Sequence, residues 1–174
     1  MIDLVPIGDV DPDAVEQLLD RAFGIDRHRR TAYALREGTI ALPWMSFAAV
    51  DGNALVGTIQ CWPVCFVPDV PDGERTAMTL MGPVAVTPER QQDGVGRRLM
   101  NAALDANKAS LEPGSAALML IGDPEYYARF FGFSAERTAA WRLPGPVERH
   151  RLLARGLSVP DVSGTIMPRV SSNA

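Results

Sequence analysis

The chain has 174 residues, of which 47% are hydrophobic and 22% charged, with a formal net charge of −4. This composition is typical of one globular domain with its own core, and the acidic balance argues against nucleic acid as a ligand. The sequence holds no apolar stretch of about 18 residues and no signal-peptide pattern, so we expect a cytoplasmic protein with no membrane partner. We expect a single domain over residues 1–158 and a loosely ordered segment over 159–174.

The N-terminal part is predicted to form a strand followed by two helices. Residues 1–7 alternate as a strand does, and Asp11-Pro12 offers a helix cap followed by proline at the first helical position. Apolar residues at helical spacing then predict a helix over 12–23, and a second helix is expected over 28–36, before a loop over 39–45. The basic run from Arg27 to Arg30 fits a solvated helix face.

A hairpin and a long strand are predicted next. Residues 46–50 and 54–62 flank the turn Asp51-Gly52-Asn53, and another strand is expected over 75–86. Gly82-Pro83 interrupts this last strand, so the sheet should bulge or open there. Cys61 and Cys65 are interpreted as packing residues, because two cysteines and two histidines make no convincing metal site.

The second half predicts a βαβ crossover. Residues 95–108 have one apolar side, and the apolar run 116–121 is typical of a buried parallel strand. A short helix over 124–131 follows, then a short strand-like segment near 141–143 and a final strand over 151–157. The pattern predicts an α/β (α+β) fold with a mixed, mostly antiparallel sheet flanked by helices.

A glycine-bearing turn joins the strand 75–86 to the helix 95–108, and it reads Gln91-Gln92-Asp93-Gly94-Val95-Gly96-Arg97-Arg98. Free N–H groups at a helix N-terminus, beside glycines without a Cβ, favour binding of a phosphate. The residues of a Walker P-loop and of a dinucleotide fingerprint are both missing. Arg97 and Arg98 lie in the first helical turn, where the helix dipole disfavours cations unless an anion binds. The turn therefore predicts a phosphate site, with a purely structural turn as the alternative.

The spacing Gln91-x-x-Gly94-x-Gly96 resembles the acetyl-CoA signature of the GNAT superfamily of N-acetyltransferases. In that family the amides of this turn hold the pyrophosphate of coenzyme A, and the pantetheine arm enters an acyl-CoA slot between two splayed parallel strands. The resemblance implies acetyl-CoA as cosubstrate, without a metal. The implied cofactor-binding residues are Val84, Ala85, Val86, Gln91, Gln92, Asp93, Gly94, Val95, Gly96, Arg97, Arg98, Asp123 and Phe130.

The segment from Gly122 to Phe133 is similar to the family's second signature, a tyrosine followed by Gly-Phe. Its particular form looks like a branch of predicted N-acetyltransferases, in which this tyrosine would protonate the leaving thiolate. Counting forward from Pro124 gives Tyr126 and Tyr127, whereas counting back from Gly132 gives Ala128. We take Tyr127 as the catalytic acid, with Tyr126 as the alternative; packing of both rings is the other interpretation.

No carboxylate after Glu74 on the strand 75–86 could act as base, so a water chain is expected to take the proton. A backbone N–H in residues 84–86 would stabilise the oxyanion. The resemblance implies direct transfer to a primary amine of a small molecule or peptide, and family dimers make a homodimer an expectation too. A non-catalytic acyl-CoA sensor and an unrelated phosphate-binding domain are the alternatives. Position alone suggests that Arg27, Arg30, Trp44 and Trp141 contact the acceptor.

Overall fold

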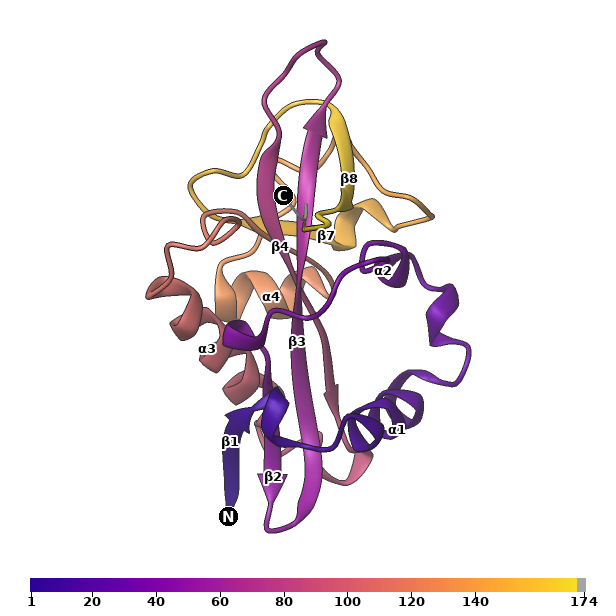
Figure 1. Ribbon diagram of the computed structural model, residues 1–174, viewed down its shortest axis with the longest axis vertical. Coiled ribbons are helices and arrows are strands. Elements are labelled where there is room, and N and C mark those ends of the chain that lie inside the picture. The colour runs from indigo at the N-terminus through magenta and orange to yellow at the C-terminus, as the bar shows by residue number, and fades with distance from the viewer. Residues whose placement is uncertain (172–174) are drawn as a thin grey trace. The chain divides into compact units, whose positions relative to one another are not determined.

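The computed structural model describes residues 1–171, which form an eight-stranded mixed sheet with helices on its flanks (Figure 1). The strand order is β1-β2-β3-β4-β5-β7, and β8 pairs with β3 and β6. The strands are β1 (Ile2–Pro6), β2 (Phe47–Asp51), β3 (Ala54–Pro68), β4 (Thr76–Val86), β5 (Leu118–Ile121), β6 (Trp141–Arg142), β7 (Leu152–Arg155) and β8 (Gly164–Pro168). The α-helices are α1 (Pro12–Phe23), α2 (Thr31–Ala34), α3 (Val95–Lys108) and α4 (Pro124–Phe131).

The sheet contains both parallel and antiparallel strand pairs. β4–β5 and β6–β8 run parallel, whereas β1–β2, β2–β3, β3–β8 and β5–β7 run antiparallel. The predicted mixed, mostly antiparallel sheet flanked by helices is therefore confirmed. By its contacts the chain divides into two compact units. The first comprises residues 1–28, 41–61 and 81–110, and the second comprises residues 29–40, 62–80 and those from 111 onward.

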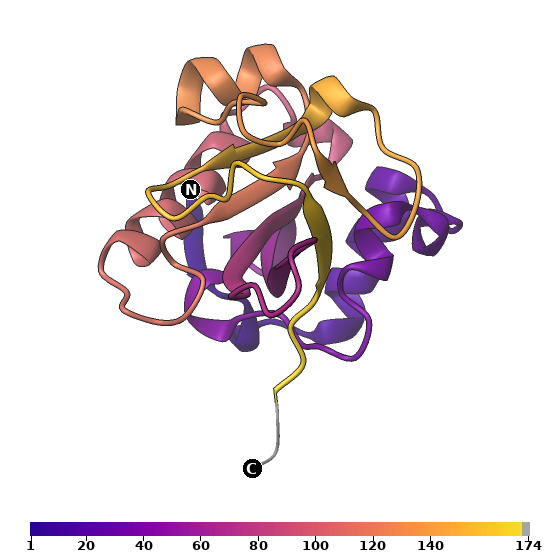
Figure 2. The same cartoon turned by 90° about the horizontal axis from the view of Figure 1, so that it is seen from above.

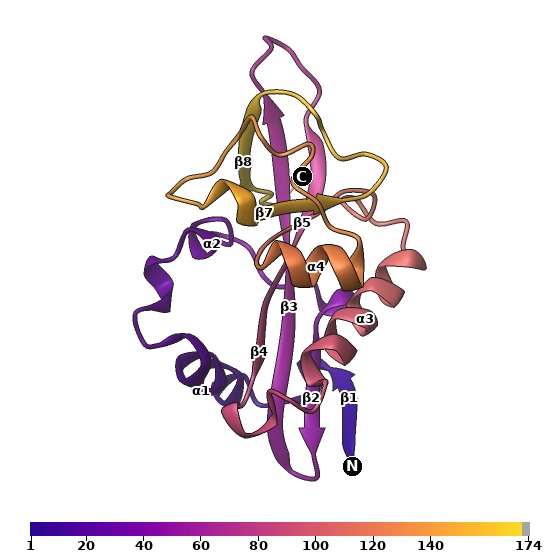
Figure 3. The same cartoon turned by 180° about the vertical axis from the view of Figure 1, so that it is seen from behind.

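In the first unit, α1 packs its apolar stripe onto the sheet. Its buried residues Val15, Leu18 and Leu19 form a core cluster with Ala85 of β4. The Asp11 carboxylate caps the helix by accepting a hydrogen bond from the Asp13 N–H at 3.0 Å. α3 lies across β2, as the view from behind shows (Figure 3). Gly57 of β3 lets this helix approach, because a Cβ there would be 2.9 Å from Val95.

In the second unit, β8 completes the sheet. It runs antiparallel to the last residues of β3, from Val64 opposite Pro168 to Pro68 opposite Gly164 (Figure 2). Trp141 of β6 is fully buried, packs 5.6 Å from the ring of Phe66, and donates its indole N–H to the Pro160 carbonyl at 3.2 Å. Trp141 of β6 and Phe66 of β3 are thus part of the buried core of the second unit.

Three predictions need correction. The helix expected over 28–36 is shorter, because α2 spans Thr31–Ala34 after a 3-10 turn. Arg27 is not part of a solvated face: it is 2% exposed and pairs with Glu16 and, at 2.9 Å, with Asp20. The segment 159–174 was expected to be loosely ordered, yet Gly164–Pro168 form β8; residues 172–174 lie outside the described part.

Gly82-Pro83 does not end the strand that contains it. β4 runs through both residues to Val86. Gly82 has φ 119°, in the region that favours glycine, and the peptide bond to Pro83 is cis. The parallel pairing of β4 with β5 comprises Thr79 opposite Leu118 and Leu80 opposite Met119 and ends before Gly82, although β5 continues to Ile121. This agrees with the opening of the sheet that the sequence predicts at Gly82-Pro83.

Candidate active site

The predicted phosphate turn ends at an uncapped helix N-terminus. Gly94 precedes α3 with φ 74° and ψ 14°, in the left-handed region, and no side chain caps the helix. Among residues 1–171, no heavy atom beyond its chain neighbours lies within 4 Å of where a Gly94 Cβ would stand. A Cβ on Gly96 would meet Val84 and Val86 at 3.8 Å, an ordinary contact. The first N–H groups of α3 and its dipole therefore present an open, anion-attracting end.

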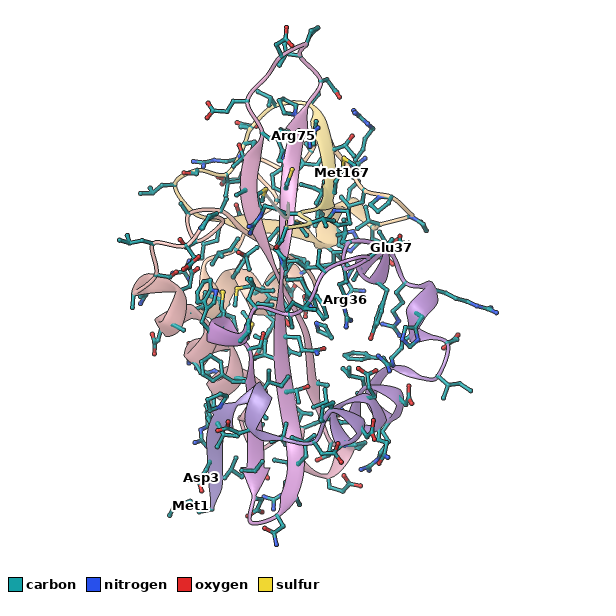
Figure 4. All side chains as sticks on the ribbon, viewed as in Figure 1. Met1, Asp3, Arg36, Glu37, Arg75 and Met167 are labelled. Carbon is teal, nitrogen blue, oxygen red and sulfur yellow. The ribbon has the colours of Figure 1, made fainter. Side chains whose placement is uncertain are left out.

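Arg90 holds this turn to the rest of the first unit. Its guanidinium pairs with Asp51, at the end of β2, and lies 3.3 Å from the Asp93 carboxylate of the turn. Asp51 also accepts from the N-terminal ammonium of Met1 at 3.3 Å, and this hydrogen bond is the main reason that the pKa of Asp51 is lowered. Figure 4 labels Met1 at this end of β1. The one sequence signal that could have pointed to Arg90 is the opposite charge of Asp93, three residues further along the chain.

Other charged residues also have structural partners around the turn. Arg21 of α1 contacts Glu89 at 2.9 Å. Arg98 donates to the Ile2 carbonyl at 3.0 Å, which joins α3 to β1. This hydrogen bond explains why a cation, Arg98, can lie near the start of α3 without a bound anion. Gln91, Gln92 and Arg97 are exposed to solvent.

The second motif forms α4 over the predicted residues, in the second unit. Asp123 caps it by accepting from the Glu125 N–H at 3.0 Å, Pro124 occupies the first turn, and Gly132 ends it with φ 71°. The Asp123 carboxylate thus has a local structural role, and its contact with coenzyme A stays a prediction.

The two tyrosines of α4 belong to one aromatic cluster. Their rings meet edge to face at 5.0 Å. Tyr126 also packs 5.3 Å from Phe130, whose side chain is 39% exposed, and Tyr127 packs 6.0 Å from Phe131 and 6.5 Å from Phe133. Both predicted candidates for the acid are therefore half-buried in an apolar surrounding.

Burial, with smaller contributions from Tyr126 and Asp123, raises the pKa of Tyr127 to about 12, against the opposing positive charge of Arg151. Within residues 1–171, the Tyr127 hydroxyl has no hydrogen-bond partner in the protein. At neutral pH this side chain is a protonated phenol whose O–H is available to a ligand.

A feature that the sequence did not indicate follows α2. The Arg36 guanidinium lies between two aromatic rings, 4.1 Å from the centre of Tyr33 and 3.9 Å from that of Trp62 (Figure 4). Trp62 is 8% exposed, and its indole N–H finds no partner among the described residues. This donor is therefore buried and unsatisfied within the described part of the chain.

The cysteines are buried and unpaired as thiols. Burial raises the pKa of Cys61 to about 12, so its sulfur is a neutral thiol and a poor nucleophile. Trp141 and Arg27, suggested by position as acceptor contacts, are buried with structural partners. Residues 1–171 contain no group of three His, Cys, Asp or Glu side chains able to hold a metal ion. None of their helices has the length and apolarity to cross a membrane.

Comparison with known proteins identifies the family of this chain. Residues 13–133 match the model of the acetyltransferase (GNAT) family. The sequence is 32% identical over 138 residues to YhbS of Escherichia coli K12, described as an uncharacterized N-acetyltransferase, covering 78% of this chain and 77% of that protein. The crystal structure of E. coli YhbS in complex with CoA matches with a TM-score of 0.68 at 27% identity, covering 97% of this chain and 89% of that one.

A GNAT family acetyltransferase from Brucella melitensis, crystallised with acetyl-CoA, matches with a TM-score of 0.60 at 24% identity, covering 97% of this chain and 96% of that one. This likeness concerns the fold. The family model spans well over half of the sequence, and the relatives match along most of their length. The chain therefore belongs to the acetyltransferase (GNAT) family.

Proposed function

We propose that this protein is an acetyl-CoA-dependent N-acetyltransferase that transfers the acetyl group directly to a primary amine of a small molecule or peptide. The observation that carries the proposal is the uncapped N-terminus of α3 at Gly94, in a chain whose relative YhbS binds CoA. In the proposed complex, the amides of Gly94, Val95 and Gly96 receive the diphosphate, and a backbone N–H in residues 84–86 stabilises the oxyanion.

In the proposed reaction the neutral amine attacks the thioester carbonyl. A C–N bond forms and the C–S bond breaks, so the nitrogen loses one proton and the departing thiolate gains one. Tyr127 supplies the proton to sulfur, and water carries the proton from nitrogen to solvent. The resulting Tyr127 phenolate then takes a proton back from solvent, so the protons balance over one turnover. A phenol of pKa about 12 remains protonated at neutral pH, so the donor form of Tyr127 is present throughout. Direct transfer is supported by Cys61, whose raised thiol pKa makes it a poor acyl carrier.

The proposal is tested by calorimetric titration with CoA, followed by a panel of amines with acetyl-CoA in which release of the free CoA thiol is measured. We expect saturable CoA binding and turnover with at least one amine class. Binding without turnover across amino acids, polyamines, aminoglycosides and peptide N-termini would instead support an acyl-CoA sensor. Absence of CoA binding by the folded protein would contradict both functions.

A further inference from the structure

The ring of Tyr127 lies on the backbone of Gly122, the buried residue between β5 and the α4 cap. A Cβ on Gly122 would stand 2.8 Å from Cδ2 of Tyr127 and closer still to Cε2. Real Cβ atoms essentially never approach another heavy atom within 3.0 Å. The space that any other residue would fill at position 122 is therefore occupied by the ring.

The backbone at Gly122 is held in place on both sides. Its N–H donates to the Arg151 carbonyl at 2.9 Å, and the preceding Ile121 pairs with Leu152 in the β5–β7 ladder. Asp123, which follows, caps α4. A side chain added at position 122 must therefore displace the ring rather than the strand.

The ring itself has limited freedom. The Tyr127 N–H donates to the Asp123 carbonyl at 3.0 Å, which fixes its Cα in the first turn of α4. Tyr126 meets the ring edge to face at 5.0 Å, and Phe131 and Phe133 lie on other sides. Together with these neighbours, the contact with Gly122 restricts the orientation of the ring and therefore the position of the hydroxyl.

We propose that Gly122 is a positioning residue for the catalytic acid, because its missing side chain seats the Tyr127 ring and thereby fixes the place of the hydroxyl. The catalytic consequence rests on the proposed function, whereas the seating of the ring is a property of the folded protein alone. The two are therefore tested by separate measurements.

The first measurement follows the tyrosines by NMR in protein labelled with ¹³C at the phenol carbon. The chain has three tyrosines, so Tyr→Phe variants assign each signal. Burial raises the pKa of Tyr127 to about 12, so a displaced, more solvated ring should titrate nearer 10. We expect this downward shift in Gly122→Ala and none in Gly8→Ala, where a Cβ meets nothing within 4 Å. An unchanged Tyr127 titration in Gly122→Ala overturns the proposal.

The second measurement is steady-state kinetics with acetyl-CoA and an accepted amine. Misplacing a reacting group by about 1 Å can cost as much as roughly 100-fold, so we expect kcat to fall at least about 10-fold in Gly122→Ala, with KM for acetyl-CoA unchanged. In a Tyr127→Phe background the same change should alter kcat less than about 2-fold. An equal loss in both backgrounds would exclude an effect through the hydroxyl. If Tyr127→Phe itself keeps full kcat, the acid assignment fails, and the NMR titration still decides the seating.

A folding control covers the case in which Gly122→Ala does not fold. If the ring is the obstacle, removing it must restore folding, so Gly122→Ala combined with Tyr127→Ala should unfold at the same denaturant concentration as Tyr127→Ala alone. A double variant that remains unfolded would show that position 122 requires glycine for another reason, and would overturn the proposal.

Discussion

At the scale of single residues, Tyr126 and Tyr127 are adjacent in sequence but differ in surroundings. Tyr127 rests on Gly122 and carries a pKa raised mainly by burial, whereas Tyr126 contacts the half-exposed Phe130. A seated hydroxyl without a protein partner suits proton donation. This difference in surroundings is our physical reason for proposing Tyr127 rather than Tyr126 as the acid, since counting forward from Pro124 gives both.

Replacing Tyr127 with phenylalanine should lower kcat by about 10²- to 10⁴-fold, because positioned acid catalysis is typically worth that much. The ring and its packing remain, so CoA affinity should change little. Steady-state kinetics and calorimetry on the purified variant measure both quantities. Tyr126→Phe is the matched control and should be milder. A larger loss in Tyr126→Phe would transfer the role to that residue.

The raised pKa of Cys61 predicts that the unfolding free energy depends on pH. Its thiol pKa rises from 9.0 to about 12 on burial. Because the folded state holds the proton more tightly, this contribution is fully present below pH 9 and is lost as pH rises toward 12, at up to about 1.4 kcal/mol per pH unit. The difference in unfolding free energy between wild type and Cys61→Ala, from urea titrations at pH 8 to 11, should therefore shrink above pH 9. A difference independent of pH would contradict the raised pKa.

At the scale of elements, helices α1 and α4 could be predicted to the residue because each begins with Asp-Pro, a cap followed by a fixed first turn. The predictions that were wrong concern elements whose structure depends on contacts between residues far apart in the sequence. Arg27 turns back to α1 and leaves four residues for α2, and β8 exists because β3 and β6 pair with it. In the candidate site, both motifs were visible in sequence, whereas the link from Arg90 to Asp51, 39 residues away, was not.

The proposed diphosphate site at the N-terminus of α3 leads to a prediction about CoA affinity. Gly96→Glu brings a carboxylate to the proposed diphosphate; at a separation of about 4 Å the repulsion is about 1–4 kcal/mol, or roughly 5- to 1,000-fold in Kd. An acidic residue in a first helical turn does not weaken the helix, so the fold should survive. Calorimetry with CoA measures the change.

Gly96→Ala is the matched control, since its Cβ meets Val84 and Val86 at an ordinary 3.8 Å. This variant should bind CoA within about 3-fold of wild type, which is less than 1 kcal/mol. Normal CoA affinity in a folded Gly96→Glu protein would contradict the assignment of the diphosphate to this turn.

At the scale of the whole molecule, one arginine near the end of the chain connects separate segments of the second unit. Arg169, directly after β8, donates to the carbonyls of Val64 at 3.0 Å, Pro113 at 3.2 Å and Met78 at 3.3 Å. These carbonyls belong to β3, the segment before β5, and β4. Burial lowers the pKa of Arg169, yet its guanidinium joins three separate segments of the second unit.

Arg169→Met keeps the aliphatic length of the side chain and removes all three hydrogen bonds, leaving carbonyls without donors. We expect a loss of about 2–4 kcal/mol in unfolding free energy, since bonds to a charged donor are worth about 1.5–3 kcal/mol each and are not additive. Arg21→Met, which breaks one solvent-exposed pair with Glu89, should cost less than about 1 kcal/mol. Urea denaturation followed by tryptophan fluorescence compares the two variants, because Trp62 and Trp141 both lie in the second unit. Equal stability of the two variants would show that β8 is held by its strand pairing alone, without the arginine that follows it.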